Sequence, residues 1–459
     1  MSNNFASLKI DIRLKRNLKD LKFEEMTPIQ EEALPIILEG KDIIAQAKTG
    51  SGKTVAFGLG VLNSIDLKQS RPQCLILCPT RELAEQVAME LRKLARAIAN
   101  LKVLTITGGS SEYHQEKSLG HGAHIIVGTP GRVIKLLKRK ALILDFVKQY
   151  VLDEADRMLD MGFIDDISRI STYVPKNRQT LLFSATFPED IEELGKRLQN
   201  DAVRVSVDVT HEGSNIKEEF FQLDSHKDKM SALIKVLAAY QAKRFIVFCK
   251  TKRISDTVAD DLCKNGVIVE SIHGDLDQNE RTAALTMFSN KSLNGIVATD
   301  VAARGIDIKD LDLVVNFDLS NDPEVYVHRI GRTGRAGNEG RAVSFLVEQE
   351  LESFENICEY QKADYQLKGL DALSGENEYS IKPEMATIYV LAGKRDKLRP
   401  GDFVGAIVGE AGINSQEIGD ILVTKNKSYI AVKADLIKHV VHSLRKGKIK
   451  KRRFKLGFL

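Results

Sequence analysis

The chain has 459 residues, of which 43% are hydrophobic and 28% charged, and its formal net charge is +4 at pH 7. This length exceeds one ordinary hydrophobic core and predicts about three domains. No apolar run approaches the roughly 20 residues that cross a bilayer, and the first ten residues lack the basic and then apolar order of a secretory signal. These properties argue against a membrane-spanning or secreted protein and predict a cytoplasmic one.

The cysteine and charge patterns indicate the redox compartment and the kind of binding partner. The five cysteines form no CxxC pair, and two of them fall in the strand-like run QCLILC (73–78), so we expect core packing, a reducing compartment and no zinc. Residues 383–459 hold about 16 basic and about 7 acidic side chains, a charge of about +9 against about −5 for the remainder. This asymmetry indicates a polyanionic partner, and a solvated charged face is the alternative.

A phosphate-binding pattern follows the apolar run 42–46, where residues 47–54 read AKTGSGKT. Its glycines let backbone N–H groups close around phosphate oxygens, while Lys53 reaches the β- and γ-phosphates. Thr54 offers its hydroxyl to Mg²⁺ at the start of a helix, whose positive end favours the same anion. The alternative is a glycine turn before a helix, since Ala47 stands where the first glycine of the motif is usual.

Five short apolar runs alternate with helix-length segments beyond this loop, and they span residues 74–78, 103–107, 124–129, 150–155 and 180–186. Continuous runs of this kind predict a parallel sheet covered on both faces. Ligands of such sheets bind beyond the carboxyl ends of the strands. The motifs PTREL, GG, TPGR, DEAD and SAT all fall at those ends, so we expect the functional site there.

The run VLDEAD places Asp153 and Glu154 at one of these strand ends. A strand-end carboxylate can hold Mg²⁺ and a second beside it can accept a proton from attacking water, which is the division of labour that ATP hydrolysis needs. Solvated surface acids are the alternative. The preceding phosphate loop favours the metal interpretation.

The periodicity breaks near residues 200–215, and a second series of apolar runs follows at 245–249, 267–274, 295–300, 313–318 and 342–347. This series has no phosphate loop, so it predicts a second parallel α/β domain that echoes the first and can close with it on a ligand. Within it, HRIGRTGR (328–335) spaces three arginines three residues apart. Guanidinium groups facing a γ-phosphate stabilise charge on the phosphoryl group in transfer, whereas a basic surface loop is the alternative.

The carboxyl end predicts a small βαββα module, with elements at 386–392, 403–412, 418–423, 428–432 and 434–444, and one further strand. Asp402 is expected to cap the first helix and Gly412 to end it. RNA-recognition-type sheets have this order and stack bases on aromatic side chains, for which Tyr389 and Tyr429 are candidates. The usual aromatic set is missing, so the loop 394–399 and the tail 446–453 are expected to bind more of the RNA.

Taken together, residues 5 to about 347 resemble a DEAD-box RNA helicase of superfamily 2. The resemblance rests on Gln30 with Phe5 upstream, AKTGSGKT, PTREL, GG, TPGR, DEAD, SAT, VFCKTK (247–252), HGD with QxxR (273–281), VATDVAARGID (297–307) and HRIGRTGR. One departure is Lys22, which stands where a glycine usually precedes the phenylalanine, here Phe23, and which bears on the adenine contact. The resemblance implies two tandem RecA-like parallel-sheet domains, with ATP and Mg²⁺ as cofactors.

The resemblance also implies a role for each matching residue. Gln30 would read adenine with Phe5 stacked on it, Asp307 would touch the ribose, and Glu154 would activate water. The phosphate loop would contribute Gly50, Ser51, Gly52, Lys53 and Thr54, with Mg²⁺ on Thr54 and Asp153. Arg332 and Arg335 would be arginine fingers. Coupling between the domains would fall to Asp156, Ser184, Thr186 and His328.

An RNA track is implied along the same two domains, and its residues would be Arg81, Gly109, Thr129, Arg132, Thr251, Gly274, Arg281 and Thr299. Hydroxyls, guanidinium groups and glycine amides contact phosphate and sugar, which carry no sequence information, so this track should bind RNA with little sequence preference. By the same resemblance the closing domains bend the bound strand and separate short duplexes locally.

Specificity is expected from the C-terminal module, which resembles the corresponding domain of DbpA-type DEAD-box proteins through KRDKLRPGD and GDFVGAIVG. That resemblance implies a hairpin of bacterial large-subunit (23S) rRNA as target and a role in ribosome assembly. The contacts expected for it are Lys394, Arg395, Lys397, Arg399, Lys451, Arg452 and Arg453. An RNA clamp or general RNA chaperone without rRNA specificity is the alternative, and a DNA translocase is disfavoured by the motif set.

The domain organisation expected from these matches has four parts: a first RecA-like domain at 1–205, a second at 206–360, a linker at 361–382 and the RNA-binding domain at 383–459. Nothing in the sequence requires more than a monomer, and neither a membrane nor DNA is an expected partner.

Overall fold

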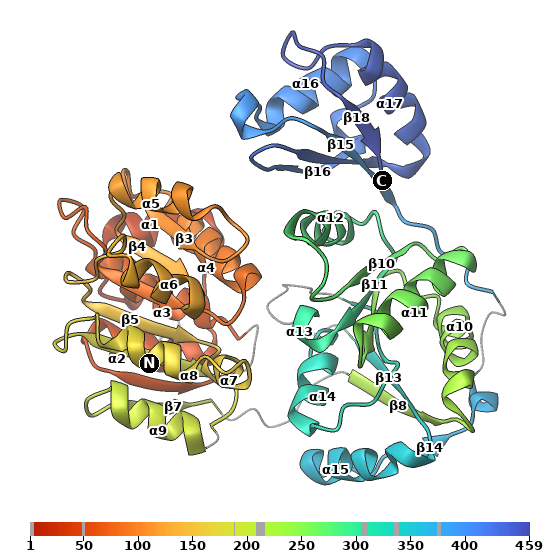
Figure 1. Cartoon of the computed structure of the whole chain (residues 1–459), viewed down its shortest axis with the longest axis horizontal. Helices are drawn as coiled ribbons and strands as arrows, with labels where there is room; N and C mark the ends of the chain where they lie inside the picture. Colours follow the sequence, from red (N-terminus) through yellow and green to blue (C-terminus); the bar gives the residue numbers. More distant parts are fainter. Residues whose placement is uncertain are drawn as a thin grey trace. The chain divides into compact units, whose positions relative to one another are not determined.

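The computed structural model describes residues 4–47, 51–187, 189–207, 216–303, 311–334, 339–373 and 378–459. These residues form two compact units that divide near residue 212. None of the described helices combines the length and apolarity that a bilayer-spanning helix needs. The elements of both units are labelled in Figure 1.

Unit 1 is built on a seven-stranded parallel sheet in the order β3-β4-β2-β5-β6-β1-β7. Its strands are β1 (Ile43–Gln46), β2 (Cys74–Leu77), β3 (Val103–Ile106), β4 (Ile125–Gly128), β5 (Gln149–Asp153), β6 (Gln179–Ser184) and β7 (Val203–Ser206). Its helices are η1 (Phe5–Ser7), α1 (Ile12–Asp20), α2 (Pro28–Leu38), α3 (Lys53–Ser64), α4 (Arg81–Leu94), α5 (Glu112–Gly120), α6 (Pro130–Lys138), α7 (Ala155–Asp160), α8 (Ile164–Ser171) and α9 (Glu189–Leu198). The five runs predicted after the phosphate loop correspond to β2 through β6.

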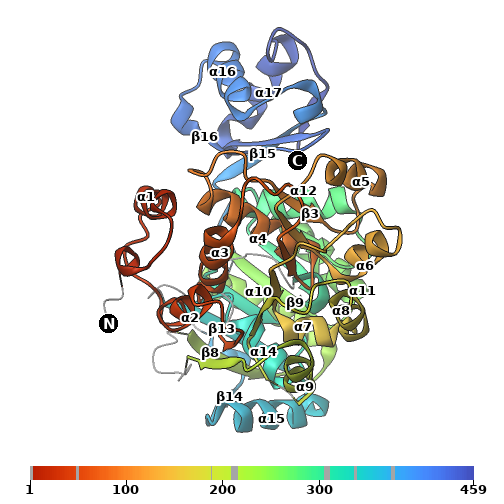
Figure 2. The ribbon, with the colours of Figure 1, turned by 90° about the vertical axis from the view of Figure 1, so that its left-hand side faces the viewer.

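Both faces of this sheet are covered, which is why its strands read as continuous apolar runs. In β2, Cys74 and Ile76 belong to one hydrophobic cluster, and Leu75 and Leu77 belong to the other. Helices α2 and α3 lie on one face and α6 and α8 on the other (Figure 2). The two clusters fix the sheet between two helical layers and leave its carboxyl edge free for a ligand.

Unit 2 contains a second seven-stranded parallel sheet, in the order β10-β11-β9-β12-β13-β8-β14. Its strands are β8 (Ile216–Gln222), β9 (Phe245–Cys249), β10 (Val269–Ile272), β11 (Gly295–Thr299), β12 (Leu313–Asn316), β13 (Gly340–Leu346) and β14 (Leu367–Lys368). Its helices are η2 (His226–Asp228), α10 (Lys229–Tyr240), α11 (Lys252–Lys264), α12 (Gln278–Ser289), α13 (Asp300–Ala303), α14 (Pro323–Ile330), η3 (Glu348–Glu350), α15 (Leu351–Gln361) and η4 (Leu370–Ala372). The sequence did not predict β7, β8 or β14, and β14 lies inside the segment expected to be a linker.

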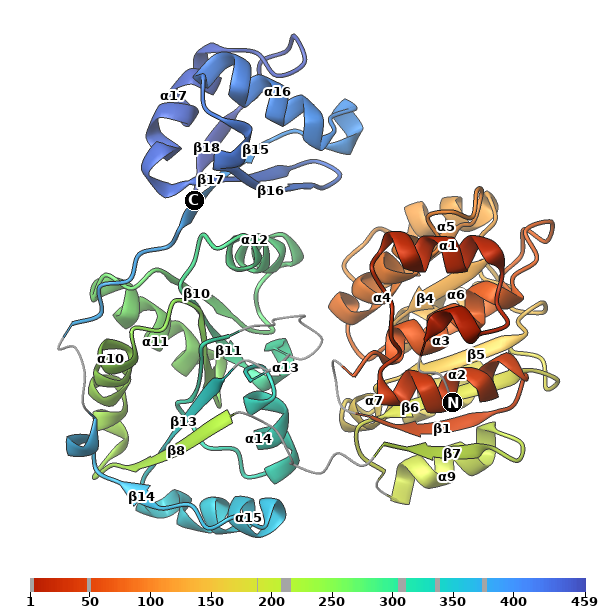
Figure 3. The same ribbon diagram turned by 180° about the vertical axis from the view of Figure 1, so that it is seen from behind.

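The C-terminal part of unit 2 is a four-stranded antiparallel sheet in the order β16-β17-β15-β18. Its strands are β15 (Met385–Val390), β16 (Ile418–Val423), β17 (Ser428–Lys433) and β18 (Leu456–Phe458). Its helices are η5 (Lys394–Asp396), α16 (Pro400–Ala411), η6 (Ser415–Glu417), η7 (Ala434–Leu436) and α17 (Ile437–Lys446). Figure 3 shows α16 and α17 on one face of this sheet. The predicted fold class, two tandem RecA-like domains followed by a small α+β domain, is confirmed.

One predicted boundary in this domain is wrong. Helix α16 begins at Pro400, not near Phe403, because proline at the first helical position has its φ angle already set for a helix. Asp402 is consequently the third helical residue, and its carboxylate accepts a hydrogen bond from the Arg399 backbone N–H at 2.8 Å. Gly412 ends the helix with φ at +68°, as predicted.

Lys22 occupies a helix-ending position that favours glycine. It follows α1 with φ at +60°, its own N–H donates to the Lys19 carbonyl, and the Phe23 N–H donates to the Leu18 carbonyl. This pair of hydrogen bonds defines a Schellman motif, whose left-handed residue is usually glycine. The departure at Lys22 therefore concerns the end of a helix, and its side chain is exposed.

Replacing Lys22 with glycine should stabilise unit 1, because a side chain in the left-handed region costs about 1 kcal/mol that glycine avoids. Lys22→Ala retains the β-carbon and should leave stability unchanged. Urea unfolding of the full chain, followed by amide hydrogen exchange in α1, measures the difference. An equal gain in both variants would show that the lysine side chain, not the backbone angle, is the unfavourable feature.

Candidate active site and RNA-binding surfaces

Three neighbouring strands of unit 1 carry the motifs expected to bind nucleotide. The order β5-β6-β1 brings the ends of the DEAD, SAT and phosphate-loop strands together, since all three run parallel. The loop residues 48–50, with Gly50 among them, lie outside the described residues. Ser51, Gly52 and the first turn of α3 complete the described part of the loop.

Helix α2 is tied to this loop by its own capping residues. Thr27 donates its hydroxyl to the Ser51 carbonyl at 2.7 Å, and the Gln30 side-chain amide donates to the Gly52 carbonyl at 3.0 Å. The Gln30 side-chain oxygen accepts from the Thr27 N–H at 3.0 Å, which closes a capping box. Both ends of the Gln30 amide are thus engaged within the chain. Phe5, the expected adenine partner, is buried and packs edge-on against Phe23.

Gly52 is required by this arrangement for two reasons. Its φ angle is +97°, and a β-carbon there would lie 2.3 Å from the Gln30 side-chain nitrogen. The sequence motif explains this glycine by the access that it gives phosphate oxygens to backbone N–H groups. The structure adds that the glycine also leaves room for the side chain that holds the loop.

Lys53 and Asp153 each carry a buried polar atom without a hydrogen-bond partner in the described part of the chain. The Lys53 Nζ and one Asp153 carboxylate oxygen are buried and have no hydrogen-bond partner among the described residues. Burial raises the pKa of the Asp153 carboxyl to about 7, although the nearby Lys53 charge works in the opposite direction. Unpaired buried ionic groups are costly, so this pair fits a site for a phosphate group and a divalent cation. Thr54 follows Lys53 as the second residue of α3.

Glu154 is held in an uncommon backbone conformation. Its φ and ψ angles are +55° and +56°, at the start of α7, a left-handed conformation that residues other than glycine adopt infrequently. Its buried carboxylate lies 3.4 Å from the Arg157 guanidinium. The strained backbone and the ion pair together fix the direction of the carboxylate.

The expected coupling residues of unit 1 form one hydrogen-bond network. An Asp156 carboxylate oxygen accepts from the backbone N–H groups of Ala185 at 3.0 Å and Thr186 at 3.1 Å, while the Asp156 N–H donates to the Ser184 hydroxyl at 3.2 Å. The DEAD and SAT motifs are therefore joined directly. The fourth member, His328, lies on α14 of unit 2.

The three arginines of HRIGRTGR have different environments. Arg329 is buried and paired with both Asp300 oxygens, at 2.7 and 2.8 Å, and it also donates to Asn316 and to the Asp318 carbonyl. It therefore holds α14 to β12 and α13 and is not available to a phosphate. Arg332 is buried just beyond α14, whereas Arg335 and Asp307 lie outside the described residues. Sequence spacing alone could not separate Arg329 from the other two.

The expected RNA track of unit 1 lies on the other half of the sheet, at the ends of the adjacent strands β2, β4 and β3. The Arg81 guanidinium lies against Gly108, where a β-carbon would be only 2.8 Å from it. Arg132 donates to the Ser110 carbonyl and to Gln115, both at 2.8 Å. These bonds hold the loop of Gly109, whose φ angle is +74°, beside Thr129, the N-cap of α6.

Unit 2 repeats this arrangement at the ends of β9, β10 and β11. Thr251, Gly274 and Thr299 line one cleft of about 900 Å³, together with Lys250 and Lys252 among others. Thr251 accepts a hydrogen bond from the Ile254 N–H and so starts α11. Arg281, on α12, donates to the Ala302 carbonyl at 2.8 Å. Three of the four expected residues of this unit thus share a single cleft.

The C-terminal domain gathers its basic residues from three segments. The expected contacts in the loop 394–399 and the tail 451–453 are all exposed. Lys450 donates to the Lys397 carbonyl at 2.7 Å, and Arg452 lies 3.4 Å from Asp396, so the tail folds onto the loop. The loop N–H groups of Lys394 and Arg395 donate to carbonyls of the turn 424–427. We name these three segments the basic patch, to which the turn 424–427 adds Lys425 and Lys427, two residues that the sequence did not indicate as RNA contacts.

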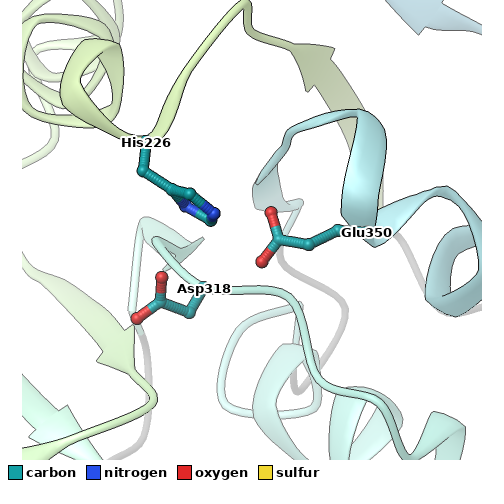
Figure 4. Close-up of side chains that lie close together, drawn as sticks. All are labelled: His226, Asp318 and Glu350. Carbon is teal, nitrogen blue, oxygen red and sulfur yellow. The ribbon is translucent and has the colours of Figure 1, made fainter.

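A cluster in unit 2 contains the residue types that bind metals, but a lysine already neutralises its acids. His226, Asp318 and Glu350 point toward one another, and their ligand atoms lie within 4.8 Å (Figure 4). The buried Lys229 ammonium lies 3.2 Å from Asp318 and 3.0 Å from Glu350, so it already neutralises the acids. Lys229 therefore joins α10 to η3 and to the residues that follow β12.

Three family models match the chain in succession: the DEAD/DEAH box helicase over residues 27–194, the helicase conserved C-terminal domain over 228–337 and the DbpA RNA binding domain over 387–457. The first two models cover the nucleotide site and the parallel sheets described above. Together they define an ATP-dependent RNA helicase with a separate RNA-binding domain.

Two relatives match almost the whole chain. The ATP-dependent RNA helicase DbpA of Escherichia coli (strain K12) is 46% identical over 434 residues, which cover 95% of this chain and 94% of the relative. The ATP-dependent RNA helicase DbpA of Bacillus subtilis (strain 168) is 35% identical over 478 residues and covers 99% of each. The chain therefore belongs to the DbpA family of DEAD-box ATP-dependent RNA helicases, which are RNA-dependent ATPases.

A solved structure agrees with this assignment. Saccharomyces cerevisiae Dbp5 bound to RNA and ADP BeF3 matches with a TM-score of 0.74 at 32% identity, covering 81% of this chain and 96% of that one. The resemblance inferred from the motifs and the predicted enzyme class are confirmed.

The raised pKa of Asp153 predicts a pH dependence of stability in the nucleotide-free protein. Between about pH 4 and pH 7 the carboxyl is protonated in the folded domain but ionised in an unfolded chain. Folding takes up a proton over this window, so the free energy of unfolding should fall as pH rises, by at most about 1.4 kcal/mol per pH unit, and level off above about pH 7. Asp153→Asn should not show this fall.

Denaturant unfolding of the two full-length proteins at intervals of half a pH unit measures how the free energy of unfolding depends on pH. Subtracting the pH curve of the Asn variant removes the contributions of the groups that titrate in both proteins. Parallel pH curves for the two proteins would mean that Asp153 is ionised in the folded domain throughout the window.

Proposed function

We propose that this RNA helicase is directed by its C-terminal domain to structured large-subunit (23S) rRNA and remodels it during assembly of the bacterial ribosome. The observation that carries the proposal is the basic patch, formed by three separate segments inside the region that matches the DbpA RNA binding domain. A single surface built from distant segments can recognise the shape of a folded RNA, which a linear basic tail cannot. The protein would act as a monomer in the bacterial cytoplasm.

We infer the following roles at the nucleotide site. Lys53 holds the β- and γ-phosphates, and Thr54 with Asp153 holds Mg²⁺, which supplies charge neutralisation at the phosphates. Glu154 takes a proton from the attacking water, and the Arg157 ion pair that fixes its carboxylate supports this role. Gln30, Phe5 and Asp307 would select adenosine. Arg332 and Arg335 would stabilise the charge on the transferred phosphoryl group.

The RNA strand would lie along the two half-sheets that do not bind nucleotide. In unit 1 this is the edge at β2, β4 and β3, and in unit 2 the cleft at β9, β10 and β11. Asp156 with Ser184 and Thr186, and His328 from unit 2, would transmit the state of the nucleotide to this track. Such contacts reach backbone phosphates, so selectivity for one RNA must come from the basic patch.

A second candidate function is an RNA clamp or general chaperone without rRNA specificity. The observation in its favour is that Tyr429 is buried and Tyr389 is half-buried with its ring close against Gly457, so neither presents an open aromatic platform for reading bases. A clamp would close on any RNA and would hydrolyse ATP with little preference among RNAs.

The proposal is tested by the ATPase rate as a function of RNA concentration. A fragment of large-subunit rRNA from the peptidyl-transferase region is compared with an unrelated structured RNA at equal salt, because phosphate contacts make affinity depend on salt. Stimulation at a far lower concentration of the rRNA fragment supports rRNA targeting. Equal stimulation by both RNAs favours the clamp.

Replacing Glu154 with glutamine should reduce ATP turnover by about 10²-fold or more, because an amide cannot accept the proton from water. The amide has nearly the same size, so ATP binding and RNA binding should persist. Single-turnover hydrolysis, with nucleotide affinity measured separately, tests both points. Normal hydrolysis would remove Glu154 from the catalytic step.

Charge reversal in the basic patch should weaken RNA binding without slowing the catalytic step. In Lys451→Glu with Arg453→Glu, the rRNA concentration that half-saturates the ATPase should rise about 10-fold or more, while the rate at saturation stays the same. Lys433→Glu with Lys438→Glu makes the same change of charge outside the patch and is the matched control. An equal loss in both proteins would indicate a general effect of net charge.

A further inference from the structure

The cleft at the ends of β9, β10 and β11 contains a carboxylate that the expected RNA contacts leave unused. Asp256 lines this cleft and belongs to α11, the helix that Thr251 caps. A negative charge repels the phosphates of a bound strand, so it is unfavourable in an RNA cleft unless it makes a contact of its own. The hydrogen bonds of Asp256 identify the atom that is open to such a contact.

Two donors at the end of β10 hold one oxygen of this carboxylate. The Ser271 hydroxyl donates to Asp256 Oδ1 at 2.6 Å, and His273 Nε2 lies 2.8 Å from the same oxygen. The Asp275 N–H donates to His273 Nδ1 at 3.4 Å, so this nitrogen is an acceptor and carries no proton. The proton of the neutral imidazole is therefore on Nε2, which donates to Asp256.

The second oxygen of Asp256 is available to a ligand. Among the described residues, Oδ2 accepts no hydrogen bond, and no lysine or arginine forms an ion pair with the carboxylate. The Asp256 side chain is 51% exposed, whereas that of His273 is 8% exposed. The bonds on Oδ1 thus orient the carboxylate, and Oδ2 remains as a fixed acceptor in the cleft.

Another acid of the cleft, Asp275, has a different environment. It lies 2.5 Å from the Lys252 ammonium, and this hydrogen bond holds the pKa of the Asp275 carboxyl below its usual range. Asp275 is thus paired with a cation, whereas the partners of Asp256 are two neutral donors. The charge of Asp256 is consequently available to strengthen a hydrogen bond from a ligand.

The other groups of the cleft indicate which part of a nucleic acid strand would meet Asp256. Thr251, Gly274 and Thr299 line the same cleft and are the residues expected to contact the sugar-phosphate backbone. The phosphate and ring oxygens of this backbone only accept hydrogen bonds, and its one donor is the ribose 2′-hydroxyl, which DNA lacks. An acceptor placed among backbone contacts therefore matches that hydroxyl.

We propose that Asp256 accepts a hydrogen bond from the 2′-hydroxyl of one ribose in this cleft and so makes unit 2 selective for RNA over DNA. Ser271 and His273 are positioning residues, because they hold the carboxylate through its other oxygen. This inference rests on the proposed RNA track. It adds a residue that recognises the kind of sugar in the strand and is indifferent to the base sequence.

Replacing single 2′-hydroxyls of a short unstructured RNA tests the proposal. Each ribose in turn carries 2′-fluorine, which keeps the sugar conformation of RNA but has no proton to donate. Affinity for the full-length chain is measured with ADP and beryllium fluoride present and at equal salt. The unsubstituted protein should show at least one position where fluorine lowers affinity by about 10-fold or more, as expected for a lost hydrogen bond to a charged group. In Asp256→Ala this loss should shrink to less than about twofold.

Three further variants serve as controls. Asp260→Ala removes the same charge from the same cleft and should retain the loss at that position. Asp256→Asn keeps an oxygen for Ser271 and His273 but carries no charge, so it should reduce the loss, and it covers the case in which the alanine variant disturbs folding. Thr299→Val removes an expected backbone contact and should lower the affinity for every RNA equally.

An equal loss at that position in the unsubstituted protein and in both Asp256 variants would overturn the proposal. A drop in affinity that is the same for fluorinated and unmodified RNA would also overturn it, because Asp256 would then only support the fold of the cleft. If Thr299→Val binds RNA as the unsubstituted protein does, the cleft is not part of the RNA track, and the proposed function fails at this point. An effect of Thr299→Val without one at the 2′-position from Asp256 overturns the role of Asp256 alone.

Discussion

All the described strands in each of the two large sheets run in one direction, and this constraint places the expected ligand sites at one edge of each sheet. Parallel strands require long crossovers, so every crossover helix begins at the same edge, where the strands end. In unit 1 the order of strands divides that edge into two halves, with β5, β6 and β1 on one and β3, β4 and β2 on the other. The motifs expected to bind nucleotide and those expected to bind RNA fall on different halves, although the three RNA-track motifs lie between the nucleotide motifs in the sequence.

Buried charges mark the difference between structural and functional positions in this protein. Lys229 and Arg329 are buried with carboxylates close enough to neutralise them, and they hold elements of unit 2 together. Lys53 and one oxygen of Asp153 are buried without hydrogen-bond partners among the described residues. The first kind of site is complete within the fold, whereas the second fits partners supplied by a ligand.

Motif order was sufficient to predict the fold class and to bring the DEAD and SAT motifs together, because parallel topology leaves little freedom once the strands are known. The sequence did not predict β7, β8 or β14. These three strands lie toward one edge of their sheets, and their polar residues weaken the apolar signal. Nor could spacing show that Gln30 is engaged by Gly52, or that the turn 424–427 joins the basic patch, because both are contacts between distant segments.

Some of the cations in and next to the basic patch are already paired with carboxylates of the protein. Lys450, directly before the tail 451–453, lies 3.2 Å from Asp402 in α16, and Arg452 lies 3.4 Å from Asp396 in the loop, so two acids already occupy the places that phosphates would take. A phosphate that binds there must displace a carboxylate, and the carboxylate then attracts a cation from solution. This uptake offsets part of the counterion release from the RNA, so affinity depends on salt less steeply than the count of lysines and arginines implies. RNA binding at the patch, as proposed, would be an exchange of anions in which RNA competes with the protein's own carboxylates for the lysines and arginines.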